Sequence, residues 1–182
     1  TLINSAISSW MPTMIMESYG VSPGISSVLT AISTCANLIA VFWVVLIYPR
    51  VFKLQTTAVG MFLLFSLPLL FILCYIGKIP MLLVLVLITL VNTFKNSIHQ
   101  FYTVEIPSAY AKCNKSGMIA GLFNAVSTFA GIIANICIGY MAERVEWNVI
   151  IFSWSALALL AMIMCFATTP LWKKFWGLSS KK

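Results

Sequence analysis

Acidic side chains are almost missing from this chain of 182 residues, which contains no Asp and only four Glu. Charged residues of both signs make up 8% of the sequence, whereas hydrophobic residues make up 61% and the mean hydropathy is +1.00. A water-soluble domain of this size needs a polar surface that such a composition cannot supply. The composition therefore predicts a protein of the lipid bilayer.

The scarcity of reactive side chains also argues against catalysis. The four Glu lie at the ends of apolar segments or between them, so they cannot form the paired carboxylates of a general acid and base. The sequence has no H-E-x-x-H, no phosphate-cradling glycine loop and no G-x-S-x-G. Its five Cys show no C-x-x-C spacing, which argues against a disulfide or a metal site. We therefore expect no enzyme activity, no cofactor and no metal.

Apolar residues gather in six segments with short polar connections. Five segments reach the roughly 20 residues that a helix needs to cross about 30 Å of hydrocarbon. The first is shorter, and because the sequence opens on Thr1 without a signal-peptide pattern, we expect its helix to begin upstream. The predicted fold is all-α, an integral membrane bundle of six transmembrane helices at 2–16, 24–48, 57–76, 81–102, 117–141 and 147–168.

Prolines and the chain end complete this division. Pro12 and Pro68 lie inside segments and should kink them, whereas Pro49, Pro80 and Pro107 should mark turns or helix ends. Residues 1–170 are expected to form the transmembrane domain. Residues 171–182 are expected to form a cytoplasmic tail whose lysines and aromatic rings rest on anionic lipid.

The placement of Lys and Arg predicts the orientation. Cytoplasmic connections of membrane proteins carry the excess of positive charge. Only Lys78 and Arg144 fall on one side, so the other side and the C-terminus should be cytoplasmic, with the protein in the plasma membrane. This topology accounts for the net charge of +7, so we expect no nucleic-acid partner. The residues assigned to the cytoplasmic side are Arg50, Lys53, Lys112, Lys115, Lys173, Lys174, Lys181 and Lys182.

The segments differ in polarity. Segments 57–76 and 147–168 have few polar side chains and should be peripheral, whereas 2–16 and 24–48 each carry a polar stripe at helical spacing. Segment 81–102 gathers seven polar side chains within about 140° of one helix face at 100° per residue. In lipid such a face must meet protein or a water-filled cavity. These seven residues are Thr89, Asn92, Lys95, Asn96, His99, Gln100 and Thr103.

Lys95 is the only charge well inside any segment. A charged side chain at membrane depth costs about 2.5 kcal/mol or more on insertion scales, which makes it a candidate functional residue. Its long stem could equally carry the ammonium group to the membrane surface. His99 lies one turn closer to the cytosol and also has two interpretations. It could be a ligand or a hydrogen-bonded packing residue.

Segment 117–141 combines small and polar residues. Gly117 and Gly121, followed by the Ala130/Ala134 pair, have the small-x-x-x-small spacing that lets another helix approach closely. Its asparagines fit either interhelical hydrogen bonds or solute contacts. Polar faces on several helices indicate a path for a small-molecule solute. The candidate substrate-binding residues are Asn4, Ser8, Trp10, Ser33, Asn37, Asn92, Lys95, Asn96, His99, Asn124 and Thr128.

Several of these features resemble the C-terminal six-helix half of a major facilitator superfamily transporter, and more specifically the organophosphate:phosphate antiporter branch. The features are Trp10-Met11-Pro12-Thr13 with Glu17, Glu105-x-Pro107, the Gly117/Gly121 pair, and Gly139-Tyr140 ahead of Trp147. The resemblance implies that an N-terminal six-helix half, or a second copy of this chain, completes the transporter within membrane lipid.

One departure from that branch concerns the substrate. The resemblance places a phosphate-binding arginine where this sequence has Asn4, and a neutral amide cannot make a charge-assisted contact with phosphate. Lys95 could supply a cation from another wall of the path. We expect a secondary transporter that moves a small polar organic solute, anionic or phosphorylated if Lys95 binds it, by alternating access. The alternative is a membrane scaffold or assembly subunit that does not transport.

Overall fold

The computed structural model describes residues 2–51, 55–111 and 114–179. The described residues form helices joined by short turns and contain no strand, which confirms the predicted all-α class. The elements are α1 (Leu2–Tyr19), α2 (Pro23–Val51), α3 (Gln55–Leu73), α4 (Met81–Gln100), the π-helix η1 (Phe101–Glu105), α5 (Ile106–Ala109), α6 (Ser116–Ala142) and α7 (Trp147–Ser179).

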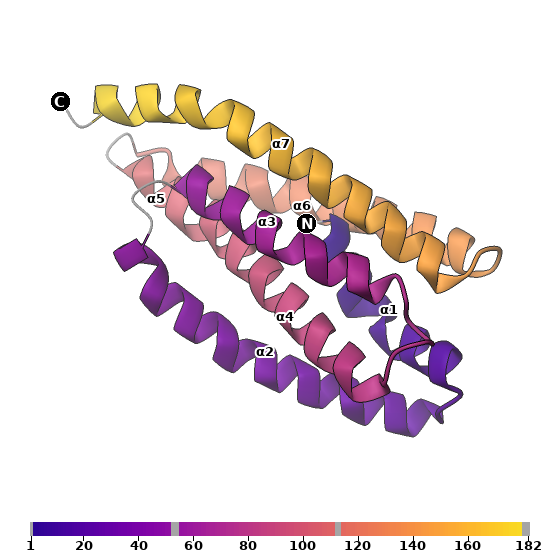
Figure 1. Cartoon of the computed structure of the whole chain (residues 1–182). Helices are drawn as coiled ribbons and strands as arrows, with labels where there is room; N and C mark the ends of the chain where they lie inside the picture. Colours follow the sequence, from indigo (N-terminus) through magenta and orange to yellow (C-terminus); the bar gives the residue numbers. More distant parts are fainter. Residues whose placement is uncertain (1, 52–54, 112–113, 180–182) are drawn as a thin grey trace.

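The long helices lie side by side in one bundle. Figure 1 shows α2 and α7 at opposite edges, with α3 and α4 between them. The α4 helix packs against α2 on one side, α3 on another and α1 on a third, while α3 also packs along α7 and α1 packs along α6. Of the two helices predicted to be peripheral, α7 lies at an edge, whereas α3 is covered on two sides by α4 and α7.

Four of these helices are long and apolar enough to cross a membrane. The candidate spans are Pro23–Val44, Met81–Ala109, Ser116–Ala142 and Trp147–Leu171, and Thr57–Leu73 is a shorter apolar stretch within α3. The last span ends where the sequence places the start of the tail, although α7 itself continues to Ser179. The structure therefore supports an all-helical chain with membrane-spanning segments.

Many large apolar side chains of the described residues are exposed. The core is built around α1, where Ile7, Met14 and Ile15 are fully buried. Yet Leu38 on α2 is 67% exposed and Ile136 on α6 is 68% exposed, and most other large side chains on the outer sides of α2, α6 and α7 resemble them. A contiguous surface of this kind would be a liability in water, but acyl chains cover it without cost.

Two prolines expected to mark helix ends lie within helical structure instead. The α2 helix passes Pro49 and ends at Val51. The segment expected to end at Tyr102 continues through η1 and α5 to Ala109, so the predicted boundary was wrong, and Pro107 lies inside the helix close to its end. The wider π-turn rearranges the backbone hydrogen bonds ahead of Pro107, which has no N–H to donate and sits in the first turn of α5.

The close approach between α6 and a neighbouring helix does not occur at the predicted glycines. A Cβ atom added at Gly117 or Gly121 would meet nothing within 4 Å among the described residues. At Gly131 it would lie 2.9 Å from Ser5 Oγ, and at Gly139 it would lie 3.4 Å from the Trp10 ring. The α1 helix therefore contacts α6 at Gly131 and Gly139, near the far end of the predicted packing surface.

Gly131→Val is expected to destabilise the protein, because the new side chain would collide with Ser5 and overpacking of this kind costs about 1–3 kcal/mol. Gly121→Val is the matched control, since it makes the same change of helix propensity where a Cβ atom has open space. Thermal unfolding in detergent should show a clearly lower Tm for the first variant only. Equal Tm values would contradict the placement of α1 on α6.

Candidate functional site

The α4 helix has three distinct faces, two of them polar. The first face contacts α2, and its hydroxyl groups make hydrogen bonds between the two helices. Ser33 and Thr89 share a hydrogen bond of 2.6 Å between their side-chain oxygens, and Thr93 Oγ1 donates to Asn37 Oδ1 over 3.2 Å. The structure therefore places two predicted solute-binding residues, Ser33 and Asn37, in the buried α2–α4 contact.

A second face of α4 is aromatic. The Phe94 ring stacks on Phe62 and Phe65 of α3, with centroid distances of 5.8 and 6.2 Å. Phe101 of η1 extends this stack against Phe62, with centroids 5.9 Å apart. These rings pack the side of α4 that faces α3. On the side that faces α2, an apolar pocket of about 280 Å³ lies between α2 and α4, and the hydroxyl groups of Ser33 and Thr89 that line it already bond to each other.

The remaining polar residues lie on a third face, which we call the α4 polar face: Asn92, Lys95, Asn96 and His99. At 100° per residue they fall within about 100° of one another. Because α2 and α3 cover the other sides of α4, this face is turned toward α1, which packs against it, and toward α6, which packs against η1. It therefore lies in the middle of the bundle rather than on its lipid side.

Two side chains on the α4 polar face are deeply buried. Asn92 is 7% exposed and Lys95 is 8% exposed. The Asn92 Oδ1 atom has no hydrogen-bond partner among the described residues. A buried acceptor without a donor costs about 1–3 kcal/mol, and such groups in native proteins call for an explanation. A solute with a hydrogen-bond donor would provide one.

His99 lies toward the C-terminal end of α4 on the same face, half-buried. Its ring is 4.8 Å from that of Tyr102, which in turn lies 6.3 Å from Phe123 of α6. Thr103 Oγ1 donates to the backbone oxygen of His99 over 2.8 Å and lies 3.5 Å from the ring nitrogen Nδ1. The ring of His99 therefore packs on Tyr102, which links it to α6.

Candidate residues on α1 and α6 are mainly exposed. Ser8 on α1 and both Asn124 and Thr128 on α6 lie on the open surface of the bundle. The side chain of Asn4 lies outside the described residues. Polar groups inside a candidate span need a protein or water partner. The side of the bundle formed by α1 and α6 therefore differs from the apolar outer surface, because its polar side chains would be uncovered in lipid.

Trp10 lies away from the α4 polar face, where α1 meets α6 and α7. Its Nε1–H donates to Asn135 Oδ1 over 3.1 Å, and its ring lies 6.4 Å from that of Trp147. The Trp147 Nε1–H donates to Glu17 Oε2 over 2.7 Å, and Gly139 packs on the Trp10 ring. We name these residues the tryptophan cluster: Trp10, Glu17, Asn135, Gly139 and Trp147.

The tryptophan cluster ties α1 to α6 and α7. Trp10 was predicted to bind solute, whereas its N–H makes a contact between helices in the structure. Asn135 was expected to make either a solute contact or an interhelical hydrogen bond, and in the structure it makes the hydrogen bond. The residue type of Trp10 could have indicated this contact, because a buried indole N–H usually has a hydrogen-bond acceptor.

Comparisons with family models, curated proteins and solved structures find no match for this chain. No group of three His, Cys, Asp or Glu that could hold a metal occurs within the part of the chain that the structure describes.

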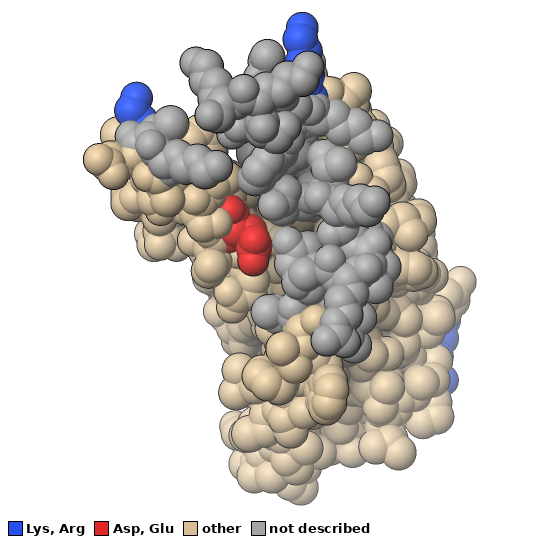
Figure 2. Space-filling model, turned by 90° about the vertical axis from the view of Figure 1, so that its left-hand side faces the viewer, with Lys and Arg blue, Asp and Glu red and all other residues tan. Residues whose placement is uncertain are grey.

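Charge is sparse on the surface and gathers at the helix ends. Figure 2 views the bundle from the end at which α5 and the C-terminal part of α7 lie. Among the described residues in this view, acidic atoms sit recessed near the middle of the face, and Lys or Arg atoms project at its edges. Since α2 also ends here, this is the end that the Lys and Arg distribution assigns to the cytosol.

Proposed function

We propose that the chain is the six-helix half of a secondary transporter of the major facilitator type and that it moves a small polar organic anion by alternating access. The observation that carries the proposal is the α4 polar face. It combines a buried ammonium group, Lys95, with a buried amide oxygen of Asn92 for which the described residues provide no donor. Membrane helices retain such costly groups chiefly where they serve a transport path.

The tryptophan cluster supports the proposed family. Trp10, Glu17, Gly139 and Trp147 carry the sequence resemblance and are separated by up to 137 positions, from 10 to 147. They contact one another through hydrogen bonds and ring packing. Motif residues that meet in space form one structural unit, which makes the resemblance stronger than a set of separate short matches.

The distribution of polar faces supports the remaining part of the proposal. Polar residues on α1 and α6 are exposed, α1 packs on α4, and α6 packs on η1, which continues α4. We propose that a second six-helix half covers these exposed polar residues and that the solute path lies between that half and the α4 polar face. The outer sides of α2, α6 and α7 would contact lipid. We further propose that all six long helices cross the plasma membrane and that the C-terminus is cytoplasmic.

The solute can be identified with the purified full-length protein. A panel of organic phosphates, carboxylates and their neutral analogues should be screened for an increase in Tm, because a ligand that binds only the folded state raises it. We expect anions to stabilise the protein and the stabilising anion to enter proteoliposomes saturably. Stabilisation by neutral analogues alone would overturn the anionic solute, and uptake no faster than in protein-free liposomes would favour the scaffold.

The orientation can be tested with two exposed lysines. In a variant without native Cys, Lys78→Cys lies in the turn between α3 and α4, and Lys115→Cys lies in the connection before α6. A membrane-impermeant maleimide should label the first on intact cells and the second only after permeabilisation. Labelling in the reverse order would show that the proposed orientation is inverted.

A further inference from the structure

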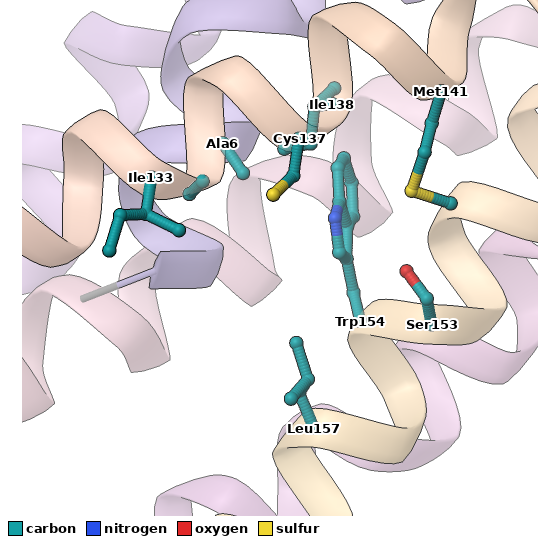
Figure 3. A pocket seen from close by; sticks show the side chains of 9 residues that line it. Ala6, Ile133, Cys137, Ile138, Met141, Ser153, Trp154 and Leu157 are labelled. Carbon is teal, nitrogen blue, oxygen red and sulfur yellow. The ribbon is translucent and has the colours of Figure 1, made fainter.

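An apolar crevice of about 230 Å³ lies where α6 and α7 diverge over α1. Figure 3 shows the Trp154 ring standing in it, with the sulfur atoms of Cys137 and Met141 on either side and Leu157 beyond. The lining hydroxyl, Ser153, already donates to the backbone oxygen of Ile150 over 2.6 Å. The crevice therefore offers little to water, because a buried water needs two or more polar partners.

The crevice is continuous with the surface that lipid would cover. Its walls include Ile133 and Leu157, which are themselves exposed, and both α6 and α7 are candidate membrane spans. The neighbouring exposed side chains on these helices, such as Phe152 and Leu160, are also large and apolar. An acyl chain from the surrounding membrane can enter such a crevice without crossing a polar barrier.

The connection between α6 and α7, which follows Met141 of the crevice wall in the chain, carries charges of both signs. Ile133, Cys137 and Met141 follow one another along α6 at intervals of one turn, so the crevice runs up toward the connection between α6 and α7. In that connection the Arg144 guanidinium group lies 4.0 Å from the centre of the Tyr140 ring, and its backbone N–H donates to Met141 O over 2.9 Å.

Two exposed carboxylates flank this cation in the chain, Glu143 on one side and Glu146 on the other. A guanidinium group binds phosphate through several N–H donors, and a carboxylate binds an ammonium group. The connection is therefore complementary to a headgroup that carries both a phosphate and an ammonium group.

We propose that this crevice binds one phosphatidylethanolamine molecule, with an acyl chain beside Trp154 and Cys137 and the headgroup phosphate on Arg144. The carboxylates of Glu143 and Glu146 favour its ammonium group over the neutral glycerol of phosphatidylglycerol. The site depends on α6 and α7 lying in a membrane and does not depend on solute transport.

Native mass spectrometry of the purified full-length protein in detergent, titrated with dioleoyl phosphatidylethanolamine, tests the site. We expect one tightly bound lipid. Arg144→Ala should weaken its binding about tenfold or more, because it removes a charge-assisted contact. Cys137→Phe should weaken it similarly by filling the crevice from an exposed position.

Two matched controls separate this site from lipid that coats the whole protein. Lys78→Ala removes the exposed cation of the α3–α4 turn, and Ile136→Phe enlarges an exposed side chain on another side of α6. Both should bind lipid within twofold of the unaltered protein. Equal losses in variants and controls would overturn the proposal. So would unchanged binding in Cys137→Phe, tighter binding of phosphatidylglycerol, or a protein dimer that Cys137→Phe dissociates.

Discussion

Replacing Lys95 with Met in the intact transporter is expected to weaken solute binding about tenfold to a hundredfold while the protein still folds. The loss follows because a hydrogen bond to a charged group contributes about 1.5–3 kcal/mol and Met cannot make it. Folding should survive, because an apolar side chain inserts into the membrane several kcal/mol more easily than an ammonium group. Solute affinity by calorimetry, with Tm measured beside it, gives both quantities.

Two further variants make this result specific to the buried ammonium group. Lys78→Met removes an exposed cation in the turn before α4 and should leave affinity unchanged. Lys95→Arg keeps the charge but alters its shape and reach, so it should retain part of the affinity. If Lys95→Met and Lys95→Arg both bind the solute normally, Lys95 lies outside the site and the case for an anion fails.

Replacing Trp147 with Ala is expected to lower the free energy of unfolding by roughly 3–5 kcal/mol, the range for removal of a large buried aromatic ring. Trp147 is buried, packs on Trp10 and donates to Glu17, so its loss would release α7 from α1. Denaturant titration in mixed micelles measures the effect. This is the largest change in stability that we expect from one substitution in the tryptophan cluster.

The controls for Trp147→Ala separate packing from hydrogen bonding. Trp147→Phe keeps most of the ring and loses the hydrogen bond to Glu17, so it should cost only about 1 kcal/mol. Trp43→Ala truncates an exposed ring on α2 and should be nearly silent. A stability loss for Trp43→Ala as large as that for Trp147→Ala would mean that the tryptophan cluster does not hold α1 to α6 and α7.

Helix positions could be predicted from sequence because apolar runs and their lengths are local properties. The fourth and sixth segments were expected to start at residues 81 and 147, and α4 and α7 start there. The errors concern helix ends near proline. A proline ends a helix only if the backbone cannot rearrange ahead of it, and the π-turn before Pro107 is such a rearrangement. The pattern of residues around Pro107 does not predict this π-turn.

The sequence predicts which residues of the candidate site share a helix face, but it does not predict which helix each face contacts. Helical spacing correctly grouped Asn92, Lys95 and His99 on one face, and two of these side chains are deeply buried. Spacing cannot say which helix lies opposite each face. Ser33 and Asn37 therefore seemed equivalent to Asn92 as solute-binding residues, although the packing of α2 on α4 uses them for contacts between helices.

The glycines of α6 illustrate the same limit. Gly117, Gly121, Gly131 and Gly139 are all compatible with close helix approach by residue type. Only the path of α1 across α6 selects Gly131 and Gly139, where Ser5 and Trp10 lie against the backbone. Tertiary packing, which depends on residues more than 100 positions away, decides which small residues are used.

The central claim is that the α4 polar face lines a path that opens alternately to the two sides of the membrane. Cysteine accessibility in proteoliposomes of the full-length protein measures this directly. In a variant without native Cys, Asn96→Cys on the α4 polar face should react with a membrane-impermeant methanethiosulfonate reagent added on either side, and the solute should slow both reactions. Val86→Cys, at an exposed apolar position of α4, should react from neither side. Reaction of Asn96→Cys from neither side, or from one side only whether or not the solute is present, would contradict alternating access.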